Sequence, residues 1–474
     1  MSKSVALLFV LFFLTASCMA VKPAMSSVDV AENSWTSKTP MQQARAGLGV
    51  AVVNGKIYAI GGSIASGSYP PDIFSDGFVG TNEEYDPETD TWTYKPSMPT
   101  PRDYFAIAAY GNKIYCIGGA VGFTVEQYGT FHSHIESGVN EVYDTVTNRW
   151  ETKTPMPDVA MKCQAHVVNG KIYVVDGPDV YAYDPKNDSW ATKTPMPNPC
   201  PQWDSSVVSA VVDNKIVVTF DFSTFVSFTM PELYEQKIVI YDTETDSWSG
   251  GISGSPIVQG GAAAATAGVN APKKVYVLGL TLGHYLSSSV NQVYDLMADA
   301  WTAATAMNVR RKDFGVAVVD DVLYAIGGYF STERHGAVTP VAVNEQYAPF
   351  GYGTVPPLVQ AVSPASHAYN ESSVSLVFTV NKQVSWTGYS VDGGETVTIA
   401  GNTTLEGLAN GVHNVTVYAK DAFGNVGTSE TVSFAVEVPE PFIATLVVAS
   451  IATVAAIAVG LLFYFKKRRV KSGG

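Results

Sequence analysis

Short apolar runs recur along the first three quarters of the chain, with polar turn residues between them. The run 48–53 (LGVAVV) precedes 55–62 (GKIYAIGG), and the same succession returns at 314–319 and 321–328. A nearly uncharged run of this length is typical of a strand covered on both faces. Asn-Gly, which joins the first pair, is a preferred two-residue hairpin turn. The pattern predicts antiparallel hairpins of short strands.

A Tyr and a Trp seven residues apart mark a second repeated element, as in 84–92 (EYDPETDTW). The Asp and Pro between them are turn formers, so each copy predicts a third strand that carries the Tyr and a fourth that opens with the Trp. A four-stranded sheet of this kind buries its faces only when copies stack, and a ring of copies closes. The five copies are Tyr85/Trp92, Tyr143/Trp150, Tyr183/Trp190, Tyr241/Trp248 and Tyr294/Trp301.

The second-strand element occurs six times, whereas the Tyr-to-Trp phrase is complete only five times. The sixth unit ends at Tyr347 with no Trp after it, and Trp35 has no Tyr before it. We therefore expect the N-terminal strand to complete the last sheet, which gives six units. The six second-strand elements are 55–62, 112–119, 170–177, 214–221, 273–280 and 321–328.

Together, the double glycine, the Tyr and the Trp resemble kelch repeats over residues 33–353. The resemblance implies an all-β, six-bladed kelch propeller closed by its N-terminal strand. Units four and five lack the double glycine at the family position. The residues that carry the resemblance are Gly61, Gly62, Gly118, Gly119, Gly327, Gly328, Trp35, Trp92, Trp150, Trp190, Trp248 and Trp301.

Residues 354–437 follow a different pattern of alternating strands with Gly, Asn and Asp turns, which predicts a small β-sandwich. It resembles immunoglobulin-like or fibronectin-type modules of prokaryotic surface proteins, and Trp386 is expected in its core. A spacer between propeller and membrane is the plain interpretation. Candidate glycosylation sequons occur at Asn187, Asn370, Asn402 and Asn414.

The two ends predict an extracellular protein with one membrane anchor. Residues 1–20 have the charge, apolar run and small residues of a secretory signal peptide. Residues 442–465 are apolar and uncharged for a length that can cross a bilayer as a transmembrane helix. The basic tail 466–474 then places the C-terminus in the cytoplasm. An open alternative is that 438–442 (VPEPF), the apolar run and the tail form a processed sorting signal.

The net charge of −14 argues against a nucleic-acid partner, since phosphate binding needs an excess of Lys and Arg. Three cysteines remain after removal of the signal. Cys163 and Cys200 either pair across neighbouring repeats or, like Cys116, are buried thiols.

Long, varied loops between the second and third strands share one face of such a propeller with the connections between units. We call this side the loop face. Two interpretations of its arginines stay open: they line a ligand site, or they hydrogen-bond neighbouring carbonyls and loop carboxylates. The candidate ligand-binding residues are Arg45, Arg102, Arg311, Trp203, Tyr329 and Phe330.

A metal site is a weaker candidate. His132 and His134 lie one residue apart in a loop, where a bare His-x-His pattern usually has no ligand role, and no cofactor is expected. No catalytic motif is present, so the favoured function is binding or adhesion, with a glycan or protein ligand at the cell surface. The alternative is a carbohydrate-active enzyme, resembling sialic-acid mutarotases or galactose oxidase, that uses the same face. A structural role in an envelope or in cell–cell contact comes third.

Overall fold

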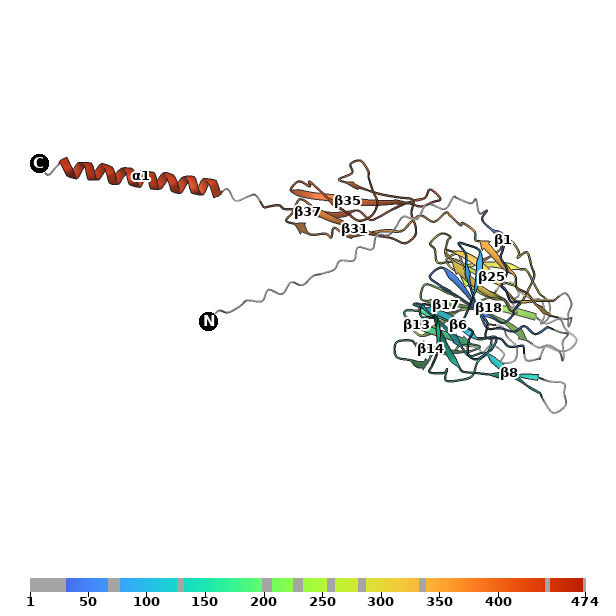
Figure 1. Ribbon diagram of the computed structural model, residues 1–474. Coiled ribbons are helices and arrows are strands. Elements are labelled where there is room, and N and C mark those ends of the chain that lie inside the picture. Colours follow the sequence, from blue (N-terminus) through green and yellow to red (C-terminus); the bar gives the residue numbers. More distant parts are fainter. Residues whose placement is uncertain are drawn as a thin grey trace, which may run out of the picture. The chain divides into compact units, whose positions relative to one another are not determined.

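The computed structural model describes residues 31–66, 77–125, 132–197, 207–224, 233–253, 261–279, 287–331, 338–439 and 444–471. The chain forms two compact units, residues 1–356 and 357–474 (Figure 1). The predicted signal peptide 1–20 and Trp203 lie outside the described residues.

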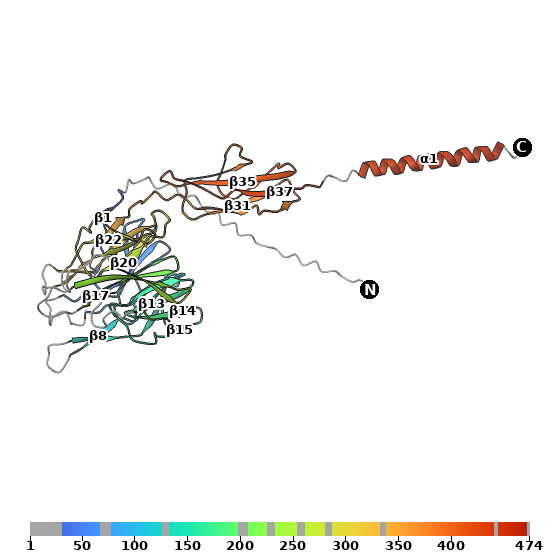
Figure 2. The ribbon, with the colours of Figure 1, turned by 180° about the vertical axis from the view of Figure 1, so that it is seen from behind.

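Six four-stranded antiparallel sheets make up the first unit, among the residues that the structure describes (Figures 1 and 2). In each sheet the first strand lies innermost, and these inner strands contact one another in sequence around a ring that β24 and β2 complete. The strands are short, and their apolar residues are buried on both faces. The all-β prediction is confirmed.

The sheets are numbered along the chain, with strands given from the inside outward. Sheet I has β2 (Gly49–Val53), β3 (Lys56–Ile60), β4 (Asn82–Asp86) and β5 (Thr91–Lys95). Sheet II has β6 (Ala106–Tyr110), β7 (Lys113–Ile117), β10 (Asn140–Asp144) and β11 (Arg149–Lys153). Sheet III has β12 (Gln164–Val168), β13 (Lys171–Asp176), β14 (Asp179–Asp184) and β15 (Ser189–Thr192).

Sheet IV has β16 (Val208–Val212), β17 (Lys215–Thr224), β18 (Leu233–Asp242) and β19 (Ser247–Ser253). Sheet V has β20 (Ala262–Ala265), β21 (Val275–Leu278), β22 (Asn291–Asp295) and β23 (Ala300–Ala303). Sheet VI has β24 (Gly315–Val319), β25 (Val322–Ile326), β28 (Asn344–Ala348) and β1 (Ser34–Lys38). Two further hairpins, β8 (Ala120–Val125) with β9 (His132–Glu136) and β26 (Tyr329–Phe330) with β27 (Thr339–Pro340), lie between second and third strands.

The repeated Tyr and Trp pack against each other in all six sheets. Tyr85 lies opposite Trp92 in the β4–β5 register, and across the six pairs the ring centroids are 4.9–5.2 Å apart. The Trp92 indole donates to Thr39 O at 2.8 Å, on the connection that arrives from the preceding sheet. Each Tyr–Trp pair therefore stabilises its own hairpin, and this indole also ties the hairpin to the neighbouring sheet.

An Asp or Asn in the turn completes this clamp. Asp90 adopts the left-handed conformation (φ +55°), accepts the Tyr85 hydroxyl at 2.6 Å and accepts Thr39 N at 2.9 Å. Asn and Asp tolerate this backbone conformation better than most residues. The acidic turns of the phrase are therefore capping turns. The equivalent residues are Asn148, Asp188, Asp246, Asp299 and, in sheet VI, Asn33.

Sheet VI joins the two ends of the first unit. β1 pairs with β28 so that Trp35 lies opposite Tyr347. Asn33 accepts the Tyr347 hydroxyl at 2.8 Å, and the Trp35 indole donates to Thr305 O at 2.7 Å. The incomplete first and last phrases therefore make one complete sheet, as the sequence predicts.

The double glycines end the second strand of sheets I, II and VI. Gly62 has φ +98°, and a Cβ there would lie 2.7 Å from Ala46 O. The chain leaves the sheet at this point, because backbone approaches backbone closely at a conformation that only glycine adopts freely. Sheet IV has no such glycine pair, and β17 and β18 instead continue as paired strands of ten residues each.

The second unit contains a small β-sandwich. One sheet has β29 (Val359–Ser363), β31 (Val374–Val380) and β34 (Thr403–Leu405). The other has β30 (Ala368–Tyr369), β37 (Val432–Val436), β35 (Gly411–Lys420), β32 (Trp386–Val391) and β33 (Val397–Ile399), with β36 (Val426–Thr428) also paired to β35. Residues of both sheets share one core, which includes Leu376 and Val417.

Trp386 was expected in that core, and this is wrong. It is only partly buried, lies over Gly388 on the same strand, and donates to Thr398 Oγ1 at 3.1 Å. The side chain covers the sheet where Gly388 leaves space. Helix α1 (Ala444–Lys471) follows the sandwich in the chain. Within the described part of the chain, no helix is both long and apolar enough to cross a membrane.

Candidate functional site

The three candidate arginines are fully buried between strands. Arg311 donates to Ala325 O and Val309 O, each at 2.9 Å, and forms an ion pair with Glu345, which is equally buried. Arg45 donates to Gly61 O at 2.7 Å and to Glu83 at 2.9 Å. Arg102 pairs with Glu141 and donates to Cys116 O at 2.8 Å. These contacts match the interpretation in which the arginines bind neighbouring carbonyls and carboxylates.

The glutamates of these pairs were missed in the sequence, although a signal for them exists. Each lies two residues before the repeated Tyr, and it is present in the three sheets that carry the arginine. In sheet III the two positions hold Ala160 and Tyr181, so neither charge is present. A buried ion of one sign without its partner is strongly unfavourable, which explains why the two residues occur together.

Tyr329 and Phe330 form β26 beside the same connections. Tyr329 is buried, and its backbone pairs with Lys312 at 2.7 Å and 3.0 Å. The Phe330 ring lies 5.5 Å from the guanidinium carbon of Arg310 and is only partly buried. Of the two, Phe330 keeps the more accessible surface.

The His132/His134 pair lies on β9. The side chain of His132 falls outside the described residues, whereas His134 packs against Phe123, with ring centroids 4.7 Å apart. Burial lowers the pKa of His134 to about 4, and the charge of Lys162 acts in the same direction. Among the residues that the structure describes, no three His, Cys, Asp or Glu side chains are grouped to hold a metal ion.

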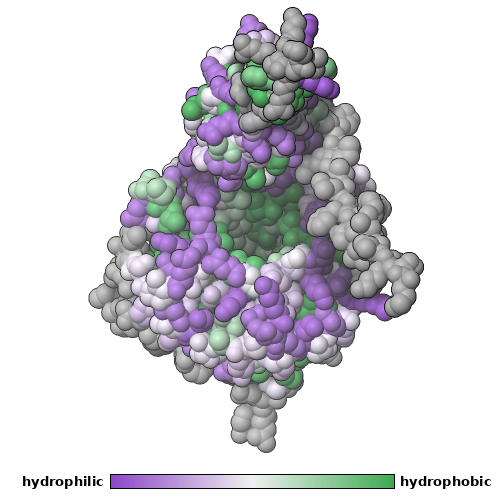
Figure 3. Space-filling view, turned by 90° about the vertical axis from the view of Figure 1, so that its left-hand side faces the viewer, coloured by the Kyte–Doolittle hydropathy of each residue, from purple (hydrophilic) through white to green (hydrophobic). Residues whose placement is uncertain are grey.

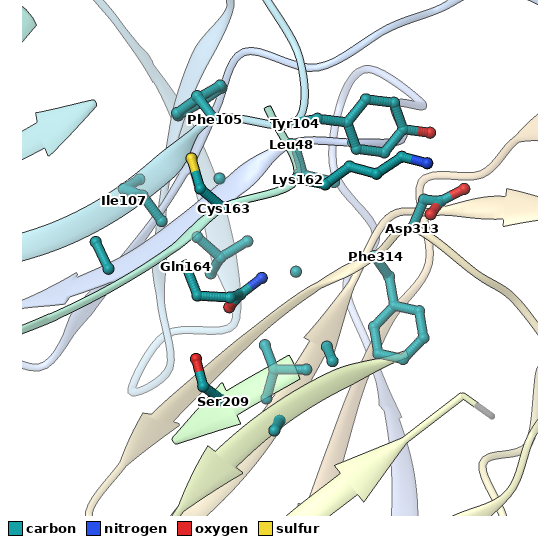
Figure 4. A pocket seen from close by; sticks show the side chains of 18 of the residues that line it. Leu48, Tyr104, Phe105, Ile107, Lys162, Cys163, Gln164, Ser209, Asp313 and Phe314 are labelled. Carbon is teal, nitrogen blue, oxygen red and sulfur yellow. The ribbon is translucent and has the colours of Figure 1, made fainter. Parts of the chain in front are cut away.

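The inner strands enclose a cavity of about 270 Å³ along the axis of the ring (Figure 4). Apolar residues such as Val50 on β2, Ile107 on β6 and Val316 on β24 line it, but the larger part of its accessible surface is polar. From the side drawn in Figure 3, the molecule shows a hollow with hydrophobic walls and a largely hydrophilic rim. A recess in which a few polar groups converge is the usual form of a ligand site.

Four residues in the left-handed conformation surround one end of this cavity. Gly47, Tyr104, Lys162 and Asp313 each stand two positions before an inner strand, with φ between +50° and +62°. Their backbones form a chain of hydrogen bonds from sheet to sheet, each 2.8 Å: Gly47 N to Asp313 O, Tyr104 N to Gly47 O, and Lys162 N to Tyr104 O. We call this set the channel mouth.

A left-handed Tyr or Lys is uncommon and costs about 1–3 kcal/mol unless its surroundings impose it. Here the backbone hydrogen bonds impose it, and the side chains of Tyr104, Lys162 and Asp313 meet at one end of the cavity (Figure 4). The Lys162 ammonium lies 5.8 Å from the centre of the Tyr104 ring. Strain of this kind is concentrated at functional sites, and it marks the mouth as the candidate site.

A buried carboxyl group, that of Asp103, lies next to the mouth. Asp103, adjacent to Tyr104, is 4% exposed, and its Oδ1 has no hydrogen-bond partner. Burial raises the pKa of Asp103 well above its ordinary value, and the negative charge of Asp313 raises it further. Burial also raises the pKa of Tyr104, and the negative charge of Asp313 raises it further. The burial of Asp103 therefore favours its protonated form.

Deeper in the cavity, His166 on β12 lies 2.7 Å from the Ser209 hydroxyl on β16, through Nε2. Burial lowers the pKa of His166 to about 4, so this imidazole is neutral at pH 7. Cys163, which also lines the cavity, and Cys116 are buried free thiols, and burial raises the pKa of each to about 12. Such thiols are unreactive. Cys200 lies outside the described residues.

All four sequon asparagines are exposed. Asn187 lies in the β14–β15 turn and donates to Asp184 Oδ2 at 2.9 Å. Asn370, Asn402 and Asn414 lie in the second unit, where Asn402 accepts Phe378 N at 3.0 Å.

The kelch motif model matches residues 44–99, 101–157 and 310–338, which fall within sheets I, II and VI. The kelch motif therefore matches three of the six four-stranded sheets. The protein contains kelch repeats, which support a kelch β-propeller. The matched segments contain two of the three buried Arg–Glu pairs in full. Of the third pair they contain Arg311, whereas Glu345 lies outside them.

Several curated proteins are similar to this kelch-repeat chain over part of its length. An F-box/kelch-repeat protein of Arabidopsis thaliana is 30% identical over 173 residues, 35% of this chain and 40% of its own. Kelch-like protein 26 of Danio rerio is 27% identical over 224 residues, 46% of this chain and 33% of its own. The Influenza virus NS1A-binding protein homolog of Mus musculus is 39% identical over 84 residues, 18% of this chain and 12% of its own. The chain thus spans less than half the length of each.

Among solved structures, that of YjhT is similar with a TM-score of 0.46 and 14% identity. The similarity covers 65% of this chain and 96% of YjhT.

Proposed function

We propose that this kelch propeller is a cell-surface binding or adhesion protein that recognises a glycan or a protein through its loop face. The observation that carries the proposal is the channel mouth. There, Tyr104, Lys162 and Asp313 are held in left-handed conformations by a backbone hydrogen-bond chain. Groups fixed in this way lose little conformational freedom when a ligand binds, which favours affinity.

Protein recognition is supported by the repeats themselves, because kelch-repeat proteins generally mediate protein–protein binding. One similar protein is named as a homolog of an influenza virus NS1A-binding protein. The β8–β9 hairpin extends the loop face beside the mouth and gives a partner further surface (Figure 1).

The placement at the cell surface rests on the sequence. We interpret each four-stranded sheet as one blade of a six-bladed propeller, and the sandwich as an immunoglobulin-like spacer. Residues 1–20 act as a signal peptide, and residues 442–465 as a single membrane anchor with a cytoplasmic tail. The four exposed sequon asparagines suit glycan attachment.

A second candidate function, a carbohydrate-active enzyme on the same face, is favoured by Asp103 and Asp313. Burial and the charge of Asp313 raise the pKa of the Asp103 carboxyl, and a carboxyl group with a raised pKa beside a second carboxylate can serve as an acid. Turnover of a bound sugar would distinguish this candidate from binding alone.

The test is binding of the full chain to panels of glycans and of purified surface proteins, comparing wild type with Asp313→Asn. Asn tolerates the left-handed backbone, so this variant removes the charge with little strain. We expect a ligand whose affinity falls in the variant. A ligand with unchanged affinity for Asp313→Asn would place recognition away from the mouth and contradict the proposal.

A further inference from the structure

A row of aromatic rings leads from the loops to the channel mouth. Phe78 stacks on Phe123 with ring centroids 5.1 Å apart and an interplanar angle of 29°. Phe123 packs on His134 at 4.7 Å, and His134 meets the edge of Tyr104 at 6.3 Å. These four residues come from sheets I and II, and each is only partly buried. The row therefore presents aromatic surface beside a polar mouth.

The polar groups next to this row include donors and acceptors. The charge of Asp313 raises the pKa of Tyr104, and the Lys162 ammonium lies 5.8 Å from the centre of the Tyr104 ring. These three residues line the cavity, whereas Asp103, whose Oδ1 is buried without a hydrogen-bond partner, does not.

Burial at the mouth disfavours charged groups. It raises the pKa of Asp103 and lowers the pKa of His134 to about 4, so both shifts favour the neutral form. The side chains of Lys162 and Asp313 carry charges of opposite sign. An acidic sugar would bring an unbalanced charge into a partly desolvated site, which is unfavourable. An uncharged ligand with many hydroxyl groups meets no such penalty.

Cavity size limits the ligand further. At about 270 Å³ the recess is near the lower end of the range for ligand sites, about 300–1,000 Å³. This volume suits one or two sugar rings in the recess.

We propose that the channel mouth binds a neutral pyranose sugar, with one C–H face of the ring on Phe123 and His134 and its hydroxyls on Tyr104, Lys162 and Asp313. The C–H face of a pyranose is weakly positive and suits the negative face of an aromatic ring. This assignment rests on the proposed function, because it names the ligand class for the same face.

The test is calorimetric titration of the full chain, purified without glycoside detergents, with methyl glycosides of glucose, galactose, mannose and N-acetylglucosamine. N-acetylneuraminic acid serves as the anionic comparison. Concentrations on the order of 10 mM detect even a millimolar Kd. The variants are Phe123→Leu, which keeps apolar bulk without the ring, and Asp313→Asn. Matched controls are Phe423→Leu, at an exposed position of the second unit, and Asp213→Asn, at an exposed position in the β16–β17 turn.

We expect at least one neutral glycoside to bind and N-acetylneuraminic acid to bind at least tenfold more weakly. Phe123→Leu should weaken binding about 2- to 12-fold, the range for one lost aromatic contact. Asp313→Asn should weaken it several-fold, and both controls should bind as wild type does. Unchanged melting temperatures would show that the variants are folded.

Three results would overturn the assignment: no neutral glycoside binds, the anionic sugar binds best, or Phe123→Leu and Asp313→Asn bind as tightly as their controls. Loss of sugar binding together with retained binding of a protein ligand to the loop face would remove this assignment alone. Loss of all loop-face binding would remove the proposed function as well.

Discussion

Replacing Arg311 by Met removes a guanidinium that has no exposed surface and leaves Glu345 buried without its partner. Two carbonyl groups, Ala325 O and Val309 O, also lose their donors. Breaking one side of a buried ion pair costs about 3–5 kcal/mol, mostly because the remaining charge is uncompensated. We therefore expect Arg311→Met to destabilise the propeller by that amount.

The neighbouring residue provides a matched control. Arg310 is exposed, and its guanidinium lies 5.5 Å from the centre of the Phe330 ring. An exposed cation–π contact contributes about 0.5–1 kcal/mol, so Arg310→Met should change stability by no more than this. At about 2 °C per kcal/mol for a unit of this size, the two melting temperatures should differ by about 4–9 °C.

The assay is thermal unfolding followed by tryptophan fluorescence and circular dichroism. The double variant Arg311→Met/Glu345→Leu should recover much of the loss, because an apolar pair often replaces a buried ion pair at little cost. Ligand affinity of Arg311→Met below its melting temperature should equal that of wild type. The structural role of the buried arginines is contradicted if Arg311→Met and Arg310→Met have the same melting temperature. It is also contradicted if Arg311→Met loses ligand binding while its stability is unchanged.

Further variants test the turns, the glycines and the channel. Asp90→Ala should lose about 2–4 kcal/mol by chemical unfolding, because it removes two hydrogen bonds and strains the turn, whereas Asp90→Asn should lose less than about 1 kcal/mol. Gly62→Ala should destabilise the protein by clearly more than Gly55→Ala. Both glycines have positive φ, but only at Gly62 would the new Cβ lie 2.7 Å from a carbonyl oxygen. Equal losses of stability would refute the claim that backbone approaches Gly62 too closely for a side chain. Burial lowers the pKa of His166 to about 4, so the folded protein holds this imidazole neutral. Its stabilising contribution is complete above the ordinary pKa of 6.5 and is lost as the pH falls towards 4. Between pH 6.5 and 4, the free energy of unfolding should therefore fall less steeply in His166→Gln than in wild type.

The ring could be predicted because its signals are local. Seven residues from Tyr85 to Trp92 are the length that places the two side chains opposite each other across a tight turn. The closing pair, Trp35 and Tyr347, followed from the same phrase split between two distant segments. Sheet IV was harder to predict, because without a double glycine nothing in the sequence marks where β17 ends.

The site was predictable only in part, because its defining property is backbone conformation. Gly47, Tyr104, Lys162 and Asp313 share an offset and a left-handed φ but no side-chain chemistry. The arginines could have been assigned to buried pairs from the glutamate two positions before each Tyr. Trp386 misled because an aromatic residue in a strand suggests a core position, whereas a neighbouring glycine can also provide its packing surface.

The most direct test of loop-face recognition blocks each face in turn. Lys162→Cys places a thiol at the mouth, and Met297→Cys places one in the β22–β23 turn, where Met297 is 95% exposed. Each variant is coupled to a bulky maleimide, and binding of the ligand found in the panel is measured. The account predicts that the adduct at position 162 abolishes binding and that the adduct at position 297 leaves it unchanged. Retained binding with position 162 blocked, or loss of binding with only position 297 blocked, would contradict it.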